Sequence, residues 1–355
     1  MNDPFGRDPG EPLVVVVNAP FEPDPSLKDM LSDTAPGCEV YFTVYNESRE
    51  LRAAKGAAGG RDPGNLETPE ITAEMRAIWK RAHVLAGIDV PTDVATLCPQ
   101  LRLFQAVSAG VDHIDRELLR RSGVRLASAS GIASASIAEF VMARLLQEWK
   151  HLRVIDTDQR DGVWNERFGN EVGGRTLLIA GLGSIGRELA RRARAFDMTV
   201  LATRASAVAG DTDPDVDELL PAAAFDELLP RADAVVCALP AIASTRDFFN
   251  QQRFDAMKSD AIFCNVGRGT LVVEEDLIAT LERGHLRAAI LDVMRNEPLD
   301  AHDPLRAAPR IYLSSHLAVS VDRYQANAWA ILDKNLRLML AGKRLHNEVD
   351  LNVKV

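Results

Sequence analysis

Cysteine is scarce in this 355-residue sequence, and its four copies are widely spaced. They stand at Cys38, Cys98, Cys237 and Cys264, without a C-x-x-C pair or a histidine at ligand spacing. Neither a disulfide framework nor a zinc site is therefore expected, and no metal site is predicted. Cys237 and Cys264 lie inside strand-like apolar runs, so we interpret them as small buried hydrophobic residues.

Long apolar runs and clusters of basic residues are also missing. The apolar run nearest the start, residues 13–17, is too short to cross a bilayer. Residues 1–12 lack the basic segment and apolar core of a secretion signal. The net charge is −10, and no basic stretch is long enough to follow a nucleic-acid backbone. These absences predict a cytoplasmic protein whose partners include neither a membrane nor a nucleic acid.

The sequence does contain enough apolar material for two cores, because 46% of its residues are hydrophobic. Strand-like and helix-like segments alternate in both halves, which is typical of parallel α/β sheets. Strands are expected at 13–18, 83–88, 101–107, 124–127, 176–180, 199–203, 234–239, 261–266, 288–291 and 311–314. Helices are expected at 72–81, 136–151, 187–196 and 320–340.

This alternation predicts two doubly wound parallel-sheet domains around a central cleft. Residues 128–317 would form the dinucleotide-binding domain. The helix at 320–340 could return to the first domain, so that residues 1–127 and 318–355 together would form a discontinuous substrate domain. Residues 56–69, rich in glycine, proline and charge, are interpreted as a mobile surface insertion of unassigned role.

A glycine turn between the strand at 176–180 and the following helix predicts a dinucleotide site. Gly181 permits the tight turn, Gly183 lets the backbone approach a pyrophosphate, and Gly186 allows close packing of helix and strand. The phosphates would then meet free N–H groups at the helix N-terminus. The predicted contacts are Gly181, Leu182, Gly183, Ser184, Ile185 and Gly186.

The end of the second strand of this unit predicts which cofactor is preferred. Enzymes that use NAD carry an acidic residue there, which binds the ribose 2′-OH. Here the strand ends in Thr203 and Arg204, followed by Ser206, and Asp211 lies beyond a glycine-containing loop. Arginine and hydroxyl groups can bind a 2′-phosphate, so NADP(H) is predicted to be preferred. Alternatively, Arg204 stacks on adenine or points into solvent, and NAD(H) is usable as well.

Three polar residues follow later strands and could carry chemistry. Oxidation of a secondary alcohol releases a proton, which the imidazole of His316 could accept, and the reverse reaction needs the imidazolium. Glu297 could orient that ring and favour its charged form. Arg268, between two glycines, could bind a substrate carboxylate through two hydrogen bonds and polarise the reacting carbonyl. Each also has an alternative interpretation, namely a solvated arginine, a surface-turn glutamate and a core histidine.

The order of these motifs resembles the D-2-hydroxyacid dehydrogenase family, including its glyoxylate/hydroxypyruvate reductases. The N-x-G-R-G loop around Arg268, the E-P-L segment at Glu297 and the late His316 carry the resemblance, which covers roughly residues 80–340. It implies a flavodoxin-like substrate domain beside a Rossmann domain. It also implies a substrate loop at Ser108, Ala109 and Gly110, and further cofactor contacts at Leu239, Pro240, Thr245, Val266, Asp292 and His316.

Departures from the family pattern are local. Ser315 replaces the proline that often precedes the histidine, and residues 318–320 lack a glycine that is common there. These changes leave the size of the substrate open.

Two functions remain compatible with the sequence. The first is an NAD(P)-dependent dehydrogenase that interconverts a small 2-keto acid and a D-2-hydroxy acid. The second is a binding protein that senses the nicotinamide cofactor, as the related transcriptional corepressors do, because fold alone does not decide function. The resemblance also implies a homodimer, formed through the apolar stripe of the helix at 137–149 and through Trp164 and Phe168 downstream.

Overall fold

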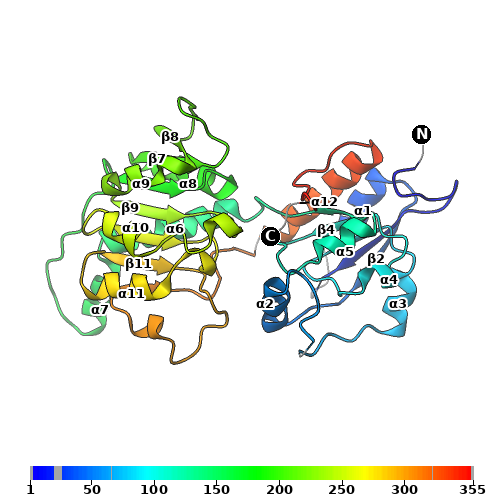
Figure 1. Ribbon diagram of the computed structural model, residues 1–355, viewed down its shortest axis with the longest axis horizontal. Coiled ribbons are helices and arrows are strands. Elements are labelled where there is room, and N and C mark those ends of the chain that lie inside the picture. Colours follow the sequence, from blue (N-terminus) through cyan, green and yellow to red (C-terminus); the bar gives the residue numbers. More distant parts are fainter. Residues whose placement is uncertain (1–2, 20–25, 65, 322, 353–355) are drawn as a thin grey trace. The chain divides into compact units, whose positions relative to one another are not determined.

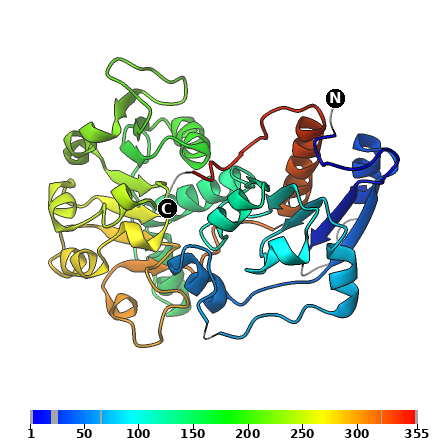
Figure 2. The same ribbon diagram turned by 45° about the vertical axis from the view of Figure 1, so that its right-hand side comes forward.

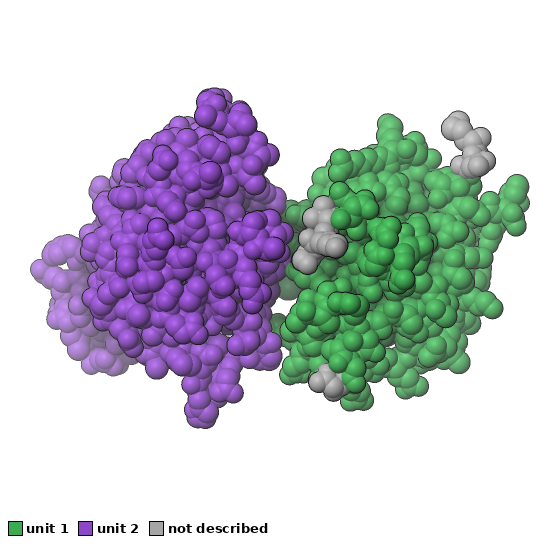
Figure 3. All heavy atoms as spheres, in the orientation of Figure 1, with its two compact units in different colours: residues 1–132, 321–355 green, residues 133–320 purple. Residues whose placement is uncertain are grey.

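The computed structural model describes residues 3–19, 26–64, 66–321 and 323–352. The chain forms two compact units, Met1–Ile132 with Val321–Val355 (unit 1) and Ala133–Ser320 (unit 2) (Figure 3). The sequence suggested limits after residues 127 and 317, slightly earlier in the chain. Each unit is built on one parallel sheet, so the predicted fold class of two parallel-sheet α/β domains is confirmed.

Unit 1 contains a five-stranded parallel sheet of order β2-β1-β3-β4-β5, the flavodoxin-like arrangement. The strands are β1 (Val14–Asn18), β2 (Glu39–Thr43), β3 (Val84–Gly87), β4 (Leu103–Ala106) and β5 (Arg125–Ala127). The helices are α1 (Ser26–Thr34), α2 (Arg49–Ala57), α3 (Ala73–Trp79), α4 (Val94–Leu97), α5 (Arg116–Arg121) and α12 (Tyr324–Leu340).

The last helix, α12, belongs to unit 1 although it follows unit 2 in the chain. It packs beside α1 (Figures 1 and 2), and a hydrogen bond between Thr34 and Asp333 joins the two helices. Ala328, Trp329 and Leu332 lie on its buried face, in the same apolar cluster as strands β1 and β3. The helical spacing of these residues lets α12 cover one face of the sheet.

Unit 2 contains a seven-stranded parallel sheet of order β12-β11-β10-β9-β6-β7-β8. The strands are β6 (Thr176–Ala180), β7 (Thr199–Arg204), β8 (Glu218–Pro221), β9 (Ala234–Cys237), β10 (Ile262–Asn265), β11 (Ala288–Leu291) and β12 (Ile311–Leu313). The α-helices are α6 (Ser134–Trp149), α7 (Leu152–Arg160), α8 (Ser184–Ala195), α9 (Phe225–Leu228), α10 (Gln251–Ala256) and α11 (Glu274–Glu282).

Apolar clusters cover both faces of this sheet. One contains the buried sides of α6 and α8, and the other contains those of α10 and α11. Ala138, Val141 and Leu145 of α6 are fully buried in the first cluster. Much of the apolar stripe expected to serve a dimer interface is therefore used inside unit 2. Cys237 and Cys264 are buried free thiols in these clusters.

The segment interpreted as a mobile insertion is anchored at its start. Residues 56 and 57 complete α2, and Gly60 is buried. A Cβ atom on Gly60 would lie 2.2 Å from the backbone nitrogen of Asp115, so the chain passes against that loop and only glycine fits there.

The residues that the structure describes include no helix with the length and the apolar character needed to cross a membrane. They also contain no group of three or more histidine, cysteine, aspartate or glutamate side chains placed to hold a metal ion.

Candidate active site

The residues predicted to carry chemistry in unit 2 follow the carboxyl ends of its parallel strands. Ala180 pairs with Thr203 and with Cys237, and Asn265 pairs with Leu291, so these strands end at one edge of the sheet. In open α/β sheets ligands bind beyond this edge. The loops after β6, β7, β9, β10, β11 and β12 are therefore placed together.

The glycine turn after β6 has the geometry of a phosphate site. Gly181 adopts φ +101°, which favours glycine, and its N–H and that of Leu182 donate to the Thr203 carbonyl. A Cβ on Gly186 would lie 2.4 Å from the Gly181 carbonyl oxygen, so glycine permits this close packing. By contrast, a Cβ on Gly183 would meet no atom within 4 Å. The backbone at the start of α8 is thus open to a ligand, and these residues fit a dinucleotide pyrophosphate.

The end of β7 is more acidic than the sequence suggested. Arg204 Nη1 lies 3.4 Å from the carboxylate of Asp213, and Arg204 Nη2 lies 3.9 Å from that of Asp211. Arg187, in the first turn of α8, pairs with the same Asp213 at 2.7 Å. Asp211 follows a glycine-containing loop in the sequence, but this loop folds back and brings the Asp211 carboxylate to the end of β7. A phosphate bound at Arg204 would lie near the carboxylates of Asp211 and Asp213 as well as near the guanidinium of Arg187.

The other residues at this strand end differ in accessibility. Thr203 is buried, and its carbonyl fixes the glycine turn, whereas Ser206 is exposed. The Nε atom of Arg204 is buried and has no hydrogen-bond partner among the described residues. An anionic oxygen would satisfy it, which fits a phosphate ligand.

The segment after β9 is held by its own hydrogen bonds. Thr245 Oγ1 lies 2.6 Å from the Pro240 carbonyl oxygen and accepts a hydrogen bond from the Ile242 N–H at 3.0 Å. Leu239 is half-buried and Pro240 is exposed, while Val266, after β10, is buried. Thr245 therefore closes the loop that carries Leu239 and Pro240.

The Arg268 loop is fixed by Asn265, the first residue of the N-x-G-R-G motif, to which sequence analysis assigned no role. The buried Asn265 side chain accepts a hydrogen bond from the Gly267 N–H at 3.0 Å and donates one to the Arg268 carbonyl at 2.9 Å. A Cβ on Gly269 would lie 1.9 Å from the Met294 carbonyl carbon. The loop therefore sits directly on the backbone of the segment that leads to Glu297.

Glu297 and His316 are brought together as predicted from their residue types. His316 Nδ1 lies 2.9 Å from Glu297 Oε2, and Glu297 Oε1 accepts a hydrogen bond from the Met294 N–H at 3.0 Å. Burial by itself raises the pKa of Glu297. The hydrogen bonds from His316 and Met294 and the positive charges of His316 and Arg268 have the larger combined effect, so the pKa of Glu297 is lowered. The carboxylate therefore stays ionised at neutral pH and can accept a hydrogen bond from His316 Nδ1.

The sequence predicts Asp292 as a cofactor contact, and in the structure its carboxylate accepts hydrogen bonds from other residues of the chain. Its carboxylate accepts hydrogen bonds from the Ser314 hydroxyl at 2.7 Å, the Leu317 N–H at 2.9 Å and the Ala318 N–H at 3.1 Å. Its carbonyl accepts a hydrogen bond from the N–H of His316, which has φ +59°. Such a backbone is uncommon outside glycine and is held here by its surroundings. Asp292 thus fixes the loop that presents His316.

The predicted substrate loop lies in unit 1, after β4. The Ser108 hydroxyl donates to the Gly110 carbonyl at 2.7 Å, and the Ser108 carbonyl accepts a hydrogen bond from the Ala129 N–H at 2.9 Å. These bonds fix the path of the loop, and Ala109 and Gly110 are exposed or half-exposed at its tip.

The sequence of this chain is similar to those of known proteins. Residues 142–318 match the NAD-binding domain of the D-isomer-specific 2-hydroxyacid dehydrogenases. Glyoxylate/hydroxypyruvate reductase B from Klebsiella pneumoniae is 33% identical over 296 residues, covering 81% of this chain and 90% of that protein. This chain belongs to the D-isomer-specific 2-hydroxyacid dehydrogenase family. As a member of it, the protein is an NAD(P)-dependent oxidoreductase of 2-hydroxy acids, and the cofactor-sensing alternative is set aside.

Solved structures agree with this dehydrogenase fold. A family member from Aeromonas salmonicida superposes with a TM-score of 0.78 at 24% identity, covering 96% of this chain and all of that one. The NADPH-dependent glyoxylate/hydroxypyruvate reductase of Sinorhizobium meliloti, in complex with NADP and sulfate, gives 0.71 at 24% identity. It covers 96% of this chain and 98% of that one.

Proposed function

We propose that this dehydrogenase reduces small 2-keto acids to D-2-hydroxy acids with His316 as the proton donor. The observation that carries the proposal is the 2.9 Å contact between His316 Nδ1 and Glu297, in a segment on which the Arg268 loop rests. The loops after three different strands supply the three groups. His316 is the acid, Glu297 is the carboxylate that orients it, and Arg268 is the cation. This set suits reduction of a carbonyl next to a carboxylate.

Each of these residues would have a separate role in the reduction of the keto acid. A bound nicotinamide supplies the hydride for the carbonyl carbon. Protonated His316, with Nδ1 held by Glu297, donates a proton from Nε2 to the carbonyl oxygen. Arg268 binds the substrate carboxylate and polarises the carbonyl.

Glyoxylate and hydroxypyruvate are the first substrates to test, because relatives at 33% identity carry their names. Purified protein would be assayed by nicotinamide absorbance with glyoxylate, hydroxypyruvate, pyruvate and phenylpyruvate. Saturable oxidation of the reduced cofactor with at least one of them is expected. The absence of turnover with all four, using either cofactor, would count against the proposal.

We further propose that NADP(H) is preferred and that NAD(H) is also used. Arg204 and Arg187 supply two guanidinium groups near the end of β7, and the buried Nε of Arg204 lacks a partner among the described residues. Asp211 and Asp213 oppose a phosphate there, which argues for a moderate preference.

Arg204→Ala tests this cofactor proposal. It should lower kcat/KM for NADPH by roughly 10–100-fold, as expected for loss of a charge-assisted hydrogen bond, and change that for NADH little. Arg194→Ala, an exposed arginine at the other end of α8, serves as the control. A wild-type preference for NADH, or equal losses with both cofactors, would contradict the assignment.

We also propose a homodimer whose interface is α7 and the segment that follows it (Figure 1). None of the residues of α7 is buried, and Trp164 and Phe168 are 98% and 83% exposed. Apolar surface of this kind marks association sites, and a second copy is the partner that most soluble oligomers use. The free thiols of the chain suit the cytoplasm, where we place the enzyme.

A further inference from the structure

Arg295 contacts the segments that follow three neighbouring strands of unit 2. It lies after β11, two residues before Glu297. Its Nε donates a hydrogen bond at 2.7 Å to the carbonyl of Val272, in the segment after β10. Its guanidinium forms an ion pair with Asp247, in the segment after β9. Its backbone N–H donates to the carboxylate of Glu274, at the start of α11, at 2.8 Å. One residue therefore joins the segments after β9, β10 and β11.

Asp247 is held from two directions. Its backbone has φ +55°, which is uncommon outside glycine. Its N–H donates to the Thr270 carbonyl at 2.9 Å, and the Phe249 N–H donates to the Leu271 carbonyl at 2.8 Å. The segment after β9 thus runs beside the segment after β10, and the ion pair with Arg295 links both to the segment after β11.

Each of the three segments carries a residue of the proposed active site. Thr245, two residues before Asp247, closes the loop that is expected to contact the cofactor. Arg268 lies in the segment after β10, and Glu297 lies in the segment after β11. Their relative positions therefore depend on the contacts that join the segments. None of the roles assigned above uses Arg295.

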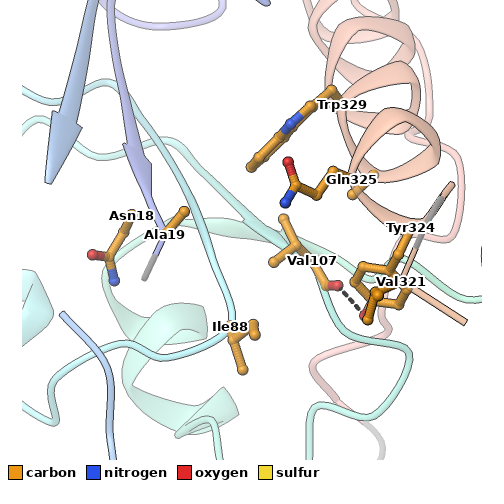
Figure 4. A pocket seen from close by; sticks show the side chains of 9 residues that line it. Asn18, Ala19, Ile88, Val107, Val321, Tyr324, Gln325 and Trp329 are labelled. Atoms are coloured by element: carbon orange, nitrogen blue, oxygen red, sulfur yellow. Dashed lines mark hydrogen bonds between the residues drawn. The ribbon is translucent and has the colours of Figure 1, made fainter. Parts of the chain in front are cut away.

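The shape of the arginine side chain suits it to this place. A guanidinium carries several N–H donors in a planar fork, so it can bind a carbonyl and a carboxylate at the same time. The Arg295 side chain is 25% exposed, so solvent screens the ion pair and its main effect is on geometry rather than on stability. Unit 1 holds its loop after β4 in a simpler way, through a hydrogen bond from the Tyr324 hydroxyl to the Val107 carbonyl at 2.6 Å (Figure 4). That bond joins two elements, whereas Arg295 joins three segments.

We propose that Arg295 is a positioning residue that fixes the Glu297 segment against its two neighbours, an inference that rests on the function proposed above. Glu297 then meets His316 in the orientation needed for proton transfer. Arg295 acts through the backbone, because Glu297 Oε1 accepts a hydrogen bond from the N–H of Met294, the residue before Arg295. Without the guanidinium this segment can move away from the other two, and a displacement of about 1 Å in an active site can cost about 100-fold in rate.

Arg295→Met tests this role, because methionine keeps an unbranched side chain and removes every donor of the guanidinium. We expect kcat for the best accepted keto acid to fall roughly 10–100-fold. The pH above which kcat/KM declines should move toward acid, as in Glu297→Gln, because the carboxylate is held less firmly beside the His316 ring. Arg295→Lys keeps the charge but not the planar fork, so it should restore kcat only in part.

Asp247→Gly provides a second variant if Arg295→Met does not fold. Glycine tolerates φ +55° and removes only the carboxylate, and kcat should fall roughly three- to tenfold. The double variant should lose no more than Arg295→Met alone, because both substitutions remove the same contact. Arg283→Met is the matched control, since it removes an exposed ion pair with Asp255 of α10, and it should leave kcat and the pH profile in place.

Urea unfolding of each variant separates positioning from stability. Reduced stability in Arg295→Met together with the kcat and pH profile of the wild type would overturn the positioning role. Additive losses in the double variant would overturn it as well, and either result would leave the reductase intact. Failure of the wild-type enzyme to turn over any keto acid would instead contradict the proposed function, and this role with it.

Discussion

The chemistry proposed for this dehydrogenase depends on how the chain holds a few polar side chains. Glu297 uses one oxygen on His316 and the other on the Met294 N–H, so its orientation is fixed from two sides. Asp292 fixes the backbone on which His316 stands. The acid and its partner are therefore positioned before a substrate arrives, which reduces the reorganisation that the reaction requires.

Glu297→Gln should shift the pH profile of keto-acid reduction toward acid. Reduction needs a proton on His316, and the Nδ1 atom of that ring lies 2.9 Å from the Glu297 carboxylate. A neutral amide in place of that carboxylate removes a negative charge beside the ring, so the pH above which kcat/KM declines should fall. Glu282→Gln, which removes an exposed carboxylate from the same unit, should leave the profile in place. An unchanged or alkaline-shifted profile in Glu297→Gln would show that the pair does not set the proton transfer.

Residue types and their order were enough to single out Arg268, Glu297 and His316 from the sequence. The supporting residues could not be found in this way. Asn265 and Gly269 act through contacts with the backbone of neighbouring loops, and Arg187 meets Asp213 only because the loop after β7 folds back. Asn265 and Gly269 belong to the N-x-G-R-G motif, but their contacts depend on tertiary structure, so the motif alone does not show what these two residues do.

At the scale of elements, the buried strands were the most predictable. β6, β9 and β10 consist mostly of apolar residues and are buried on both faces of the sheet, as parallel strands usually are. The edge strands β2 and β8 were missed because they are mostly half-buried and contain polar residues or proline. Helix α7 was missed because none of its residues is buried.

Gly269→Ala should disturb two loops at once. Its Cβ would lie 1.9 Å from the Met294 carbonyl carbon, so the Arg268 loop or the Glu297 segment must shift. We expect a loss of roughly 1–3 kcal/mol in the free energy of unfolding, measured with urea, and a large fall in kcat/KM. Gly173→Ala is the matched control, since its Cβ would make only ordinary contacts at 3.6 Å. Wild-type stability and activity in Gly269→Ala would contradict the close approach of these loops.

At the scale of the whole molecule, the proposed dimer uses a segment that unit 2 leaves uncovered. The Arg167–Asp158 ion pair and a hydrogen bond from Asn170 N–H to the Trp149 carbonyl fold this segment back along α7. Trp164 and Phe168, which flank Arg167 in the sequence, remain exposed. An ordered segment that presents large apolar side chains is suited to association rather than to solvent.

Trp164→Ser combined with Phe168→Ser should convert the dimer to a monomer. Light scattering at micromolar concentration should give twice the chain mass for the wild type and a single chain mass for the double variant. Val208→Ser, which replaces another exposed apolar residue of unit 2, should remain dimeric. A wild-type protein with the mass of one chain would rule out the proposed assembly.

The assignment of His316 as the proton donor is the central claim, and His316→Ala tests it most directly. The measurements are kcat for the best accepted keto acid across pH and the dissociation constant for NADPH by fluorescence titration. The variant should lose at least about 100-fold in kcat, with the dissociation constant changed no more than about twofold. His302→Ala, at an exposed histidine, should retain both values. Near wild-type kcat in His316→Ala at all pH values would contradict the mechanism.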